Sequence, residues 1–181
     1  IADGAPHLKA LGSRELISCS DCLLFSRPLA EGIRRISGEL EPGRRTLAAS
    51  PETGEVRADG DTSRLTLPLP EYGLQLMPLA GSFFQANWHL NRELVRFVEE
   101  RTAGFERVAD LYAGAGNFAL PCATSAGRVL ALEQETGAAE GAGQAAEAHG
   151  LDNVLVRQLD LGAQDPAASL GDFGPQALIL D

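Results

Sequence analysis

The second half of the chain alternates short apolar runs with helical segments, and no other feature constrains the fold as strongly. The runs that predict strands cover residues 107–112, 128–133, 153–159 and 176–181. Helices are predicted over about 117–125, along an Ala-rich segment that Gly150 closes, and near Ala167. Strands that alternate with helices pair in parallel through right-handed crossovers. We therefore expect an α/β fold, a doubly wound sheet with the strand order 3-2-1-4.

A smaller unit precedes this sheet. Residues 1–80 predict a small α+β domain, with a helix over 23–37 and short strands, interrupted by prolines, within 38–82. Residues 81–181 form the second predicted domain. It opens with a helix that Asn87 caps and that runs to about Ala103. The apolar residues of that helix that fall on one face are Leu90, Leu94, Phe97 and Val98.

The last apolar run, residues 177–180, is too hydrophobic for an exposed strand at the edge of a sheet. We therefore expect more strands to follow and the chain to be part of a longer protein. No apolar run reaches the roughly 18 residues that span a bilayer, and no secretory leader is present, which predicts a cytoplasmic protein without a membrane partner. Nothing in the sequence implies an obligate protein partner.

Charge limits the ligands that each half can bind. The net charge is −10, whereas phosphate contacts are usually made by Lys and Arg, which argues against a free-standing nucleic-acid binder. Residues 83–181 contain six Lys and Arg against fourteen Asp and Glu. This half therefore favours a small neutral or cationic ligand. Any RNA-contacting surface is expected in the first half or in sequence outside this chain.

Polar residues and glycines follow the predicted strands at the ends where such sheets bind ligands. Gly114 and Gly116 form a turn after the first strand, where glycine lets the backbone approach a ligand closely. Glu133 ends the second strand and can accept both hydroxyl hydrogens of a ribose. Asp160 follows the third strand and can face an adenine edge, and Asp181 ends the fourth, beside the cleft.

Each of these residues also has a purely structural interpretation: a tight connection for the glycines, a solvated strand end or loop carboxylate for the acids. Their position at the same end of successive strands favours a nucleotide-type site. Two cofactors remain open, because residues 114–119 (GAGNFA) also match the alanine version of the G-x-G-x-x-G/A pattern of nicotinamide dinucleotide folds.

A wider set of motifs resembles the RNA uracil-5-methyltransferase family, which methylates uridine in tRNA and rRNA. In chain order these are FFQAN at 83–87, DLYAGAGNFALP at 110–121, Glu133, Asn153-Val154 with Asp160, and LILD at 178–181. The match covers residues 81–181, and residues 1–80 match loosely as the central domain. Ala113 stands where many relatives have Cys.

The resemblance implies a Rossmann-like class I methyltransferase sheet that binds S-adenosyl-L-methionine. The residues that it places at the cofactor, together with the glycines of the turn, are Gln85, Tyr112, Asn117, Glu133, Asp160 and Asp181. It implies RNA as the substrate of the full-length protein. Two other functions stay open, an NAD-dependent oxidoreductase domain and a non-catalytic RNA-binding remnant.

The resemblance also implies catalytic residues that this chain lacks. In the family a cysteine attacks carbon 6 of uracil and a glutamate removes the carbon-5 proton, and both follow the Asp-Pro motif whose Asp resembles Asp181. No catalytic residue is therefore expected here, and Cys122 is interpreted as a core cysteine on the first sheet helix.

The other two cysteines, Cys19 and Cys22, have only His7 nearby as a further metal ligand, so no independent metal site is expected. Cys22 resembles the last of four iron–sulfur ligands in some family members. A cluster is expected only in a full-length protein that also has the three earlier cysteines. The three cysteines of the chain do not form a disulfide framework.

Overall fold

A four-stranded parallel sheet forms the centre of the second half of the chain in the computed structural model, which describes residues 7–9, 15–19, 22–23, 25–36 and 43–181. Its strands are β7 (Arg107–Leu111), β8 (Arg128–Glu133), β9 (Val154–Gln158) and β10 (Ala177–Leu180). They lie in the order β10-β7-β8-β9 and all pair in parallel. From the other edge this is 3-2-1-4, so the predicted fold class and strand order are confirmed.

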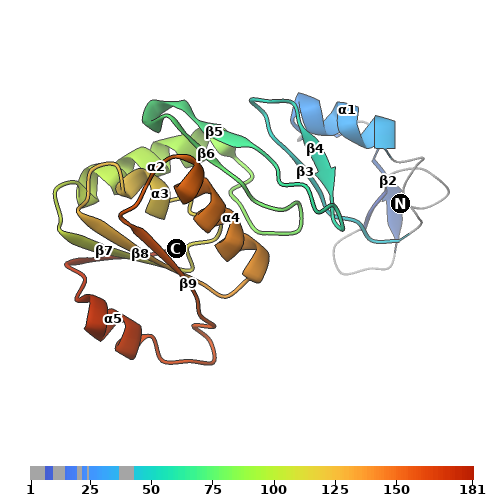
Figure 1. Ribbon diagram of the computed structural model, residues 1–181. Coiled ribbons are helices and arrows are strands. Elements are labelled where there is room, and N and C mark those ends of the chain that lie inside the picture. Colours follow the sequence, from blue (N-terminus) through green and yellow to red (C-terminus); the bar gives the residue numbers. More distant parts are fainter. Residues whose placement is uncertain (1–6, 10–14, 20–21, 24, 37–42) are drawn as a thin grey trace.

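Helices cover both faces of this sheet (Figure 1). On one side lie α2 (Trp88–Thr102), α3 (Ala119–Cys122) and α4 (Thr136–Ala148); on the other lies α5 (Ala167–Phe173). Successive strand residues point to opposite faces, so Val108 and Val129 pack toward α2 and α3, whereas Leu130 packs toward Phe173 of α5. β7 and β8 lie between β9 and β10 in the sheet, so the chain crosses back over the sheet after β9. This connection runs through α5, on the face opposite α2, α3 and α4.

The predicted helix over 87–103 is confirmed as α2. Asn87 caps it, with its side-chain oxygen accepting a hydrogen bond from the Leu90 N–H at 3.1 Å. The apolar face predicted from the sequence packs on the sheet only in part: Val98 contacts the core, whereas Leu90, Leu94 and Phe97 are exposed. The residues of α2 that are buried are Trp88, Asn91, Val95 and Thr102.

The first half contains short elements, as predicted. They are β1 (His7–Lys9), β2 (Leu16–Ser18), α1 (Arg27–Ile36), β3 (Leu47–Ala49), β4 (Val56–Ala58), β5 (Leu67–Leu69), the 3₁₀ turn η1 (Pro70–Tyr72) and β6 (Leu74–Leu76). Among the described residues these strands form three antiparallel pairs, β1–β2, β3–β4 and β5–β6. Helix α1 packs on β3–β4. It is shorter than the helix predicted over 23–37, whose residues 24 and 37 lie outside the described residues.

The β5–β6 hairpin packs against the sheet domain rather than standing apart from it. Leu67 and Leu76 share one buried cluster with Trp88, with Leu120 of α3 and with Ala145 of α4. A common core thus extends across residue 80. The domain boundary expected there stays a prediction. No helix in the described ranges is long and apolar enough to cross a bilayer.

Candidate functional site

A cavity of about 440 Å³ opens at the carboxyl ends of β7, β8 and β10. This is the edge of an open α/β sheet where ligands bind, and the volume lies within the range of small-molecule sites. Its lining comes from four segments that are far apart in sequence. The lining residues are Gly81, Ser82, Phe83, Gln85, Tyr112, Gly114, Glu133, Gln134, Glu135, Ala138 and Asp181.

The turn after β7 brings backbone and an aromatic ring to the cavity. Tyr112 has a φ of +62°, a left-handed conformation that a bulky residue rarely adopts. Gly114 also has a positive φ, and its N–H donates to Oε2 of Glu133 at 2.8 Å. The N–H of Ala113 donates to the carbonyl oxygen of Leu132 at 3.0 Å. The turn is thus fixed against the neighbouring strand β8.

Glu133 ends β8 and is buried, with 7% of its surface exposed. Besides the bond from Gly114, its Oε1 accepts a hydrogen bond from the N–H of Glu135 at 2.7 Å. Both oxygens are therefore held in place by backbone donors. A carboxylate has about four acceptor positions, so Glu133 keeps lone pairs that can accept hydroxyl hydrogens from a ligand.

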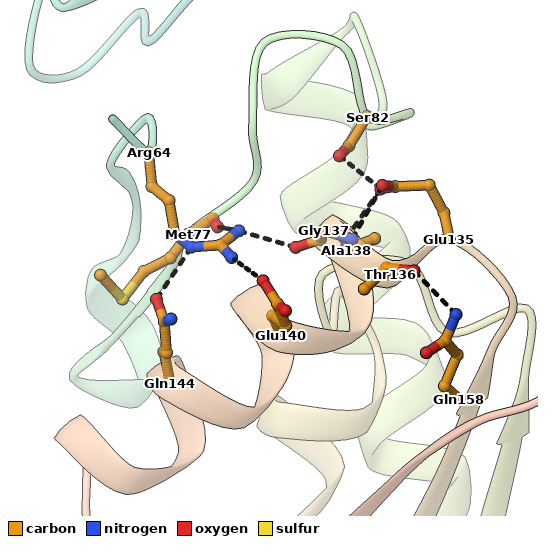
Figure 2. A network of polar contacts seen from close by, with 10 residues as sticks. All are labelled: Arg64, Met77, Ser82, Glu135, Thr136, Gly137, Ala138, Glu140, Gln144 and Gln158. Atoms are coloured by element: carbon orange, nitrogen blue, oxygen red, sulfur yellow. Dashed lines mark hydrogen bonds and ion pairs between the residues drawn. The ribbon is translucent and has the colours of Figure 1, made fainter. Parts of the chain in front are cut away.

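Glu135 is a second carboxylate at the cavity, and sequence reasoning missed it. It caps α4 by accepting from the N–H groups of Gly137 and Ala138 at 2.8 and 2.7 Å, and from the Ser82 hydroxyl at 2.7 Å (Figure 2). Burial tends to raise the pKa of Glu135, but the Ser82 and backbone hydrogen bonds and the charge of Arg64 together lower it. The only signal in the sequence was its place before the helix, where Asp, Asn, Ser and Thr are the usual caps.

Gln85 and Asp181 meet at the cavity from opposite ends of the domain. The Gln85 amide Nε2 donates to Oδ2 of Asp181 at 3.2 Å, which joins the segment before α2 to the end of β10. Phe83 lines the cavity from the same segment with 78% of its surface exposed. The structure thus brings together Gln85, Tyr112, Gly114, Glu133 and Asp181 of the eight predicted cofactor residues.

The other three predicted residues, Gly116, Asn117 and Asp160, are not among those that line the cavity. The amide of Asn117 forms two reciprocal hydrogen bonds with that of Asn91 on α2, at 2.7 and 3.0 Å. Asp160 accepts from the N–H groups of Gly162 and Ala163 in its own turn. A ligand contact of these three residues stays a prediction.

Asp110 lies beneath the cavity on β7 and was also missed, although a carboxylate inside an apolar strand is a visible signal. It is fully buried, and neither of its oxygens has a hydrogen-bond partner among the described residues. Burial raises the pKa of Asp110 to about 8; the nearby Ala119 N–H opposes this without meeting hydrogen-bond geometry, and the charges of Asp181 and Glu133 add to the rise. A pKa of about 8 favours the protonated, neutral form of Asp110 at pH 7.

The cysteines lie away from the cavity. Cys122 is buried in the core under α2, as expected, where its sulfur accepts from the Thr102 hydroxyl at 3.1 Å. Burial raises the pKa of Cys122 to about 11, which suppresses its thiolate. In the first half, burial and the neighbouring Cys22 raise the pKa of Cys19. The described ranges contain no cluster of three or more His, Cys, Asp or Glu suited to a metal ion.

Comparison with solved structures supports the fold. The Pyrococcus abyssi tRNA (uracil-54, C5)-methyltransferase in complex with S-adenosyl-L-homocysteine matches with a TM-score of 0.60 and 19% identity, over 81% of this chain and 50% of that chain. M. jannaschii TYW2 in complex with AdoMet matches with a TM-score of 0.50 and 21% identity, over 61% of this chain and 50% of that chain. At this identity the likeness shows the fold alone, a Rossmann-like α/β sheet.

Sequence comparison identifies the family. A protein named 23S rRNA (uracil(1939)-C(5))-methyltransferase RlmD from Pseudomonas fluorescens is 32% identical over 96% of this chain and 39% of its own length. One of the same name from Azoarcus is 38% identical over 63% of this chain and 25% of its own. The chain thus spans less than half the length of these relatives. The model of the family described as tRNA (Uracil-5-)-methyltransferase matches residues 51–165. This match covers more than half of the chain, and the motifs at 83–87 and 110–121 predict the same family. The chain belongs to the tRNA (uracil-5-)-methyltransferase family.

Proposed function

We propose that this chain forms the S-adenosylmethionine-binding part of an RNA methyltransferase that methylates carbon 5 of uridine. The observation that supports this most strongly is the convergence of Tyr112, Gly114, Glu133 and Asp181 on one cavity at the carboxyl edge of the sheet. In the proposed complex Glu133 accepts the ribose hydroxyls with the lone pairs that its two backbone donors leave free.

The charge of the cavity fits this cofactor. Three carboxylates line it, those of Glu133, Glu135 and Asp181, and none of the lining residues in the described part of the chain is Lys or Arg. S-adenosylmethionine carries a sulfonium and an ammonium group against one carboxylate, so its net charge is positive, which an acidic cavity stabilises. When bound, it would supply the methyl group as an electrophile. Tyr112, which is 45% exposed, lines the cavity and would offer its aromatic ring to the bound cofactor.

The same charge disfavours the alternative cofactor. A nicotinamide dinucleotide would bring a pyrophosphate next to the three carboxylates without a cationic side chain to offset the repulsion. Its pyrophosphate would have only the backbone of the glycine turn as a partner. The G-x-G-x-x-A pattern at 114–119 is therefore insufficient to support an oxidoreductase.

The test is calorimetric titration of the 181-residue chain with S-adenosylhomocysteine and, separately, with NAD. We expect saturable binding of S-adenosylhomocysteine and none of NAD. Binding of NAD alone would overturn the proposal in favour of a dehydrogenase. Binding of neither, by a chain that circular dichroism shows to be folded, would overturn the cofactor assignment and favour the non-catalytic remnant.

For the whole protein we propose a uridine of 23S rRNA as the target, since the relatives at 32% and 38% identity carry that name. The tRNA enzyme of similar fold makes tRNA the second candidate. Mass spectrometry of nucleosides from purified 23S rRNA and tRNA distinguishes the two. Cells that lack the gene are expected to lose 5-methyluridine from 23S rRNA and keep it in tRNA; the opposite pattern would overturn the rRNA assignment.

A further inference from the structure

Arg64, which precedes β5, extends its guanidinium to helix α4 (Figure 2). Nη1 donates to the carbonyl oxygens of Gly137 and Met77 at 2.7 and 3.2 Å, and Nε donates to Oε1 of Gln144 at 2.8 Å. Nη2 lies 3.3 Å from Oε2 of Glu140. The side chain of Arg64 is only 12% exposed. One side chain thus joins the loop after β6 to two turns of α4.

This contact needs a helix without side chains at the point of approach. A Cβ added to Gly141 would lie 2.5 Å from the carbonyl oxygen of Met77 and 2.8 Å from Nη1 of Arg64. A Cβ added to Gly137 would lie 2.7 Å from Cδ1 of Leu79. Gly141 therefore lets the Met77 carbonyl and the guanidinium reach the helix, and Gly137 leaves room for the Leu79 side chain, at the cost of helix propensity that glycine brings.

The helix turn that Arg64 contacts is also part of the cavity wall. Glu133 and Glu135, just before α4, and Ala138, in its first turn, all line the cavity. The N–H of Glu135 fixes one oxygen of Glu133, and the side chain of Glu135 caps the helix that Arg64 contacts at the Gly137 carbonyl. A displacement of this turn would therefore move both carboxylates.

The ion pair with Glu140 is not the main part of this contact. The Glu140 side chain is 61% exposed, and exposed pairs contribute little. The bonds to backbone carbonyls are charge-assisted and shielded from water, and a planar guanidinium makes them in fixed directions. Geometry rather than charge distinguishes Arg64 from a lysine at this site.

We propose that Arg64 is a positioning residue for the cofactor cavity: by holding the first turn of α4, which Glu135 caps, it keeps the carboxylate of Glu133 directed at the ribose. This inference rests on the proposed function. It predicts that the loss of Arg64 weakens the ribose contacts in particular, rather than ligand binding in general.

The experiment compares Arg64→Ala and Arg64→Lys with the wild-type chain, and Arg96→Ala serves as the matched control because Arg96 pairs with Glu93 on the exposed surface of α2. Dissociation constants are measured for S-adenosylhomocysteine and for its 2′-deoxy analogue. We expect Arg64→Ala to weaken the first ligand about tenfold and to reduce the discrimination between the two. Arg64→Lys should recover part of the loss, and Arg96→Ala should match the wild type.

Amide hydrogen exchange at residues 135–139 provides a readout without ligand, and it keeps the test valid even if the wild-type chain binds no S-adenosylhomocysteine. Faster exchange there in both Arg64 variants, with β7 and β8 protected as in the wild type, supports the inference. Unchanged exchange, or an equal loss of affinity for both ligands, would overturn it. If Arg64→Ala does not fold, the same two measurements on Arg64→Lys decide.

Discussion

Oε2 of Glu133 accepts the N–H of Gly114 at 2.8 Å, so the acid that ends β8 holds the glycine turn that follows β7. Two neighbouring strands are thus joined at their carboxyl ends by a side chain rather than by the sheet. The bond orients the acid and the turn toward the same cavity before any ligand is present. Such preorganisation reduces the entropy that binding must offset.

Glu133→Ala is expected to weaken S-adenosylhomocysteine binding by about 1–3 kcal/mol, because ribose hydroxyls would lose their acceptor in a buried setting. Calorimetric titration measures this. Glu147→Ala is the control, since Glu147 lies on helix α4, which follows Glu133, and is not among the residues that line the cavity. An unchanged dissociation constant in a folded Glu133→Ala chain would contradict the assignment of Glu133.

Asp110 makes stability depend on pH. Its ordinary pKa is 3.8 and its folded pKa is about 8, so the folded state holds a proton that the unfolded chain releases. The stabilisation is complete below about pH 4 and is lost as the pH rises toward about 8, with a slope of at most about 1.4 kcal/mol per pH unit. The nearby negative charges of Asp181 and Glu133 contribute to the raised pKa of Asp110.

Asp110→Asn tests this dependence because it removes the titration and keeps the shape. Urea unfolding of both chains between about pH 5 and about pH 8.5 gives the two slopes. The wild-type chain is expected to lose stability relative to Asp110→Asn as the pH rises. Parallel curves would show that Asp110 is ionised in the folded protein.

Two glycines of α4 provide a matched pair for stability. Gly141→Ala is expected to destabilise the chain by about 1–3 kcal/mol, because its Cβ would meet the Met77 carbonyl oxygen at 2.5 Å. The Cβ that Gly143→Ala adds would have no other atom within 4 Å. This substitution is expected to stabilise the folded chain by about 0.5–1 kcal/mol through helix propensity. Thermal unfolding of both measures the difference. Equal shifts would contradict the close approach of the hairpin.

The 181-residue chain is expected to transfer no methyl group to RNA. Carbon 5 of uracil becomes nucleophilic only after addition at carbon 6, and no cysteine is among the described residues that line the cavity. Incubation with labelled S-adenosylmethionine and unmodified tRNA and rRNA checks this, with a full-length relative as the positive control. Label in 5-methyluridine above the level without protein would contradict it.

Sequence reasoning predicted the features that depend on local pattern. Alternating runs determined the strand order, and parallel strands then placed Glu133 and Asp181 at one edge. Features that depend on packing between distant segments were not predictable. The motif around Asn117 predicts an amide that faces the ligand. In the structure, the position of α2 places the Asn91 amide in hydrogen-bond contact with it. Arg64 carries no motif, and its role depends on a helix that starts more than seventy residues later.

The shared core of β5–β6 and α4 has a consequence for where the chain can be shortened. A protein that begins at residue 81 would keep every residue of the cavity, yet it would lack Arg64 and the hairpin leucines. The surfaces of Leu120 and Ala145, now fully buried, would meet water. Such a truncation is expected to aggregate, whereas one that retains residues from about 63 onward keeps the cover of α4. We therefore expect the smallest part of the chain that folds alone to begin before the first cofactor motif.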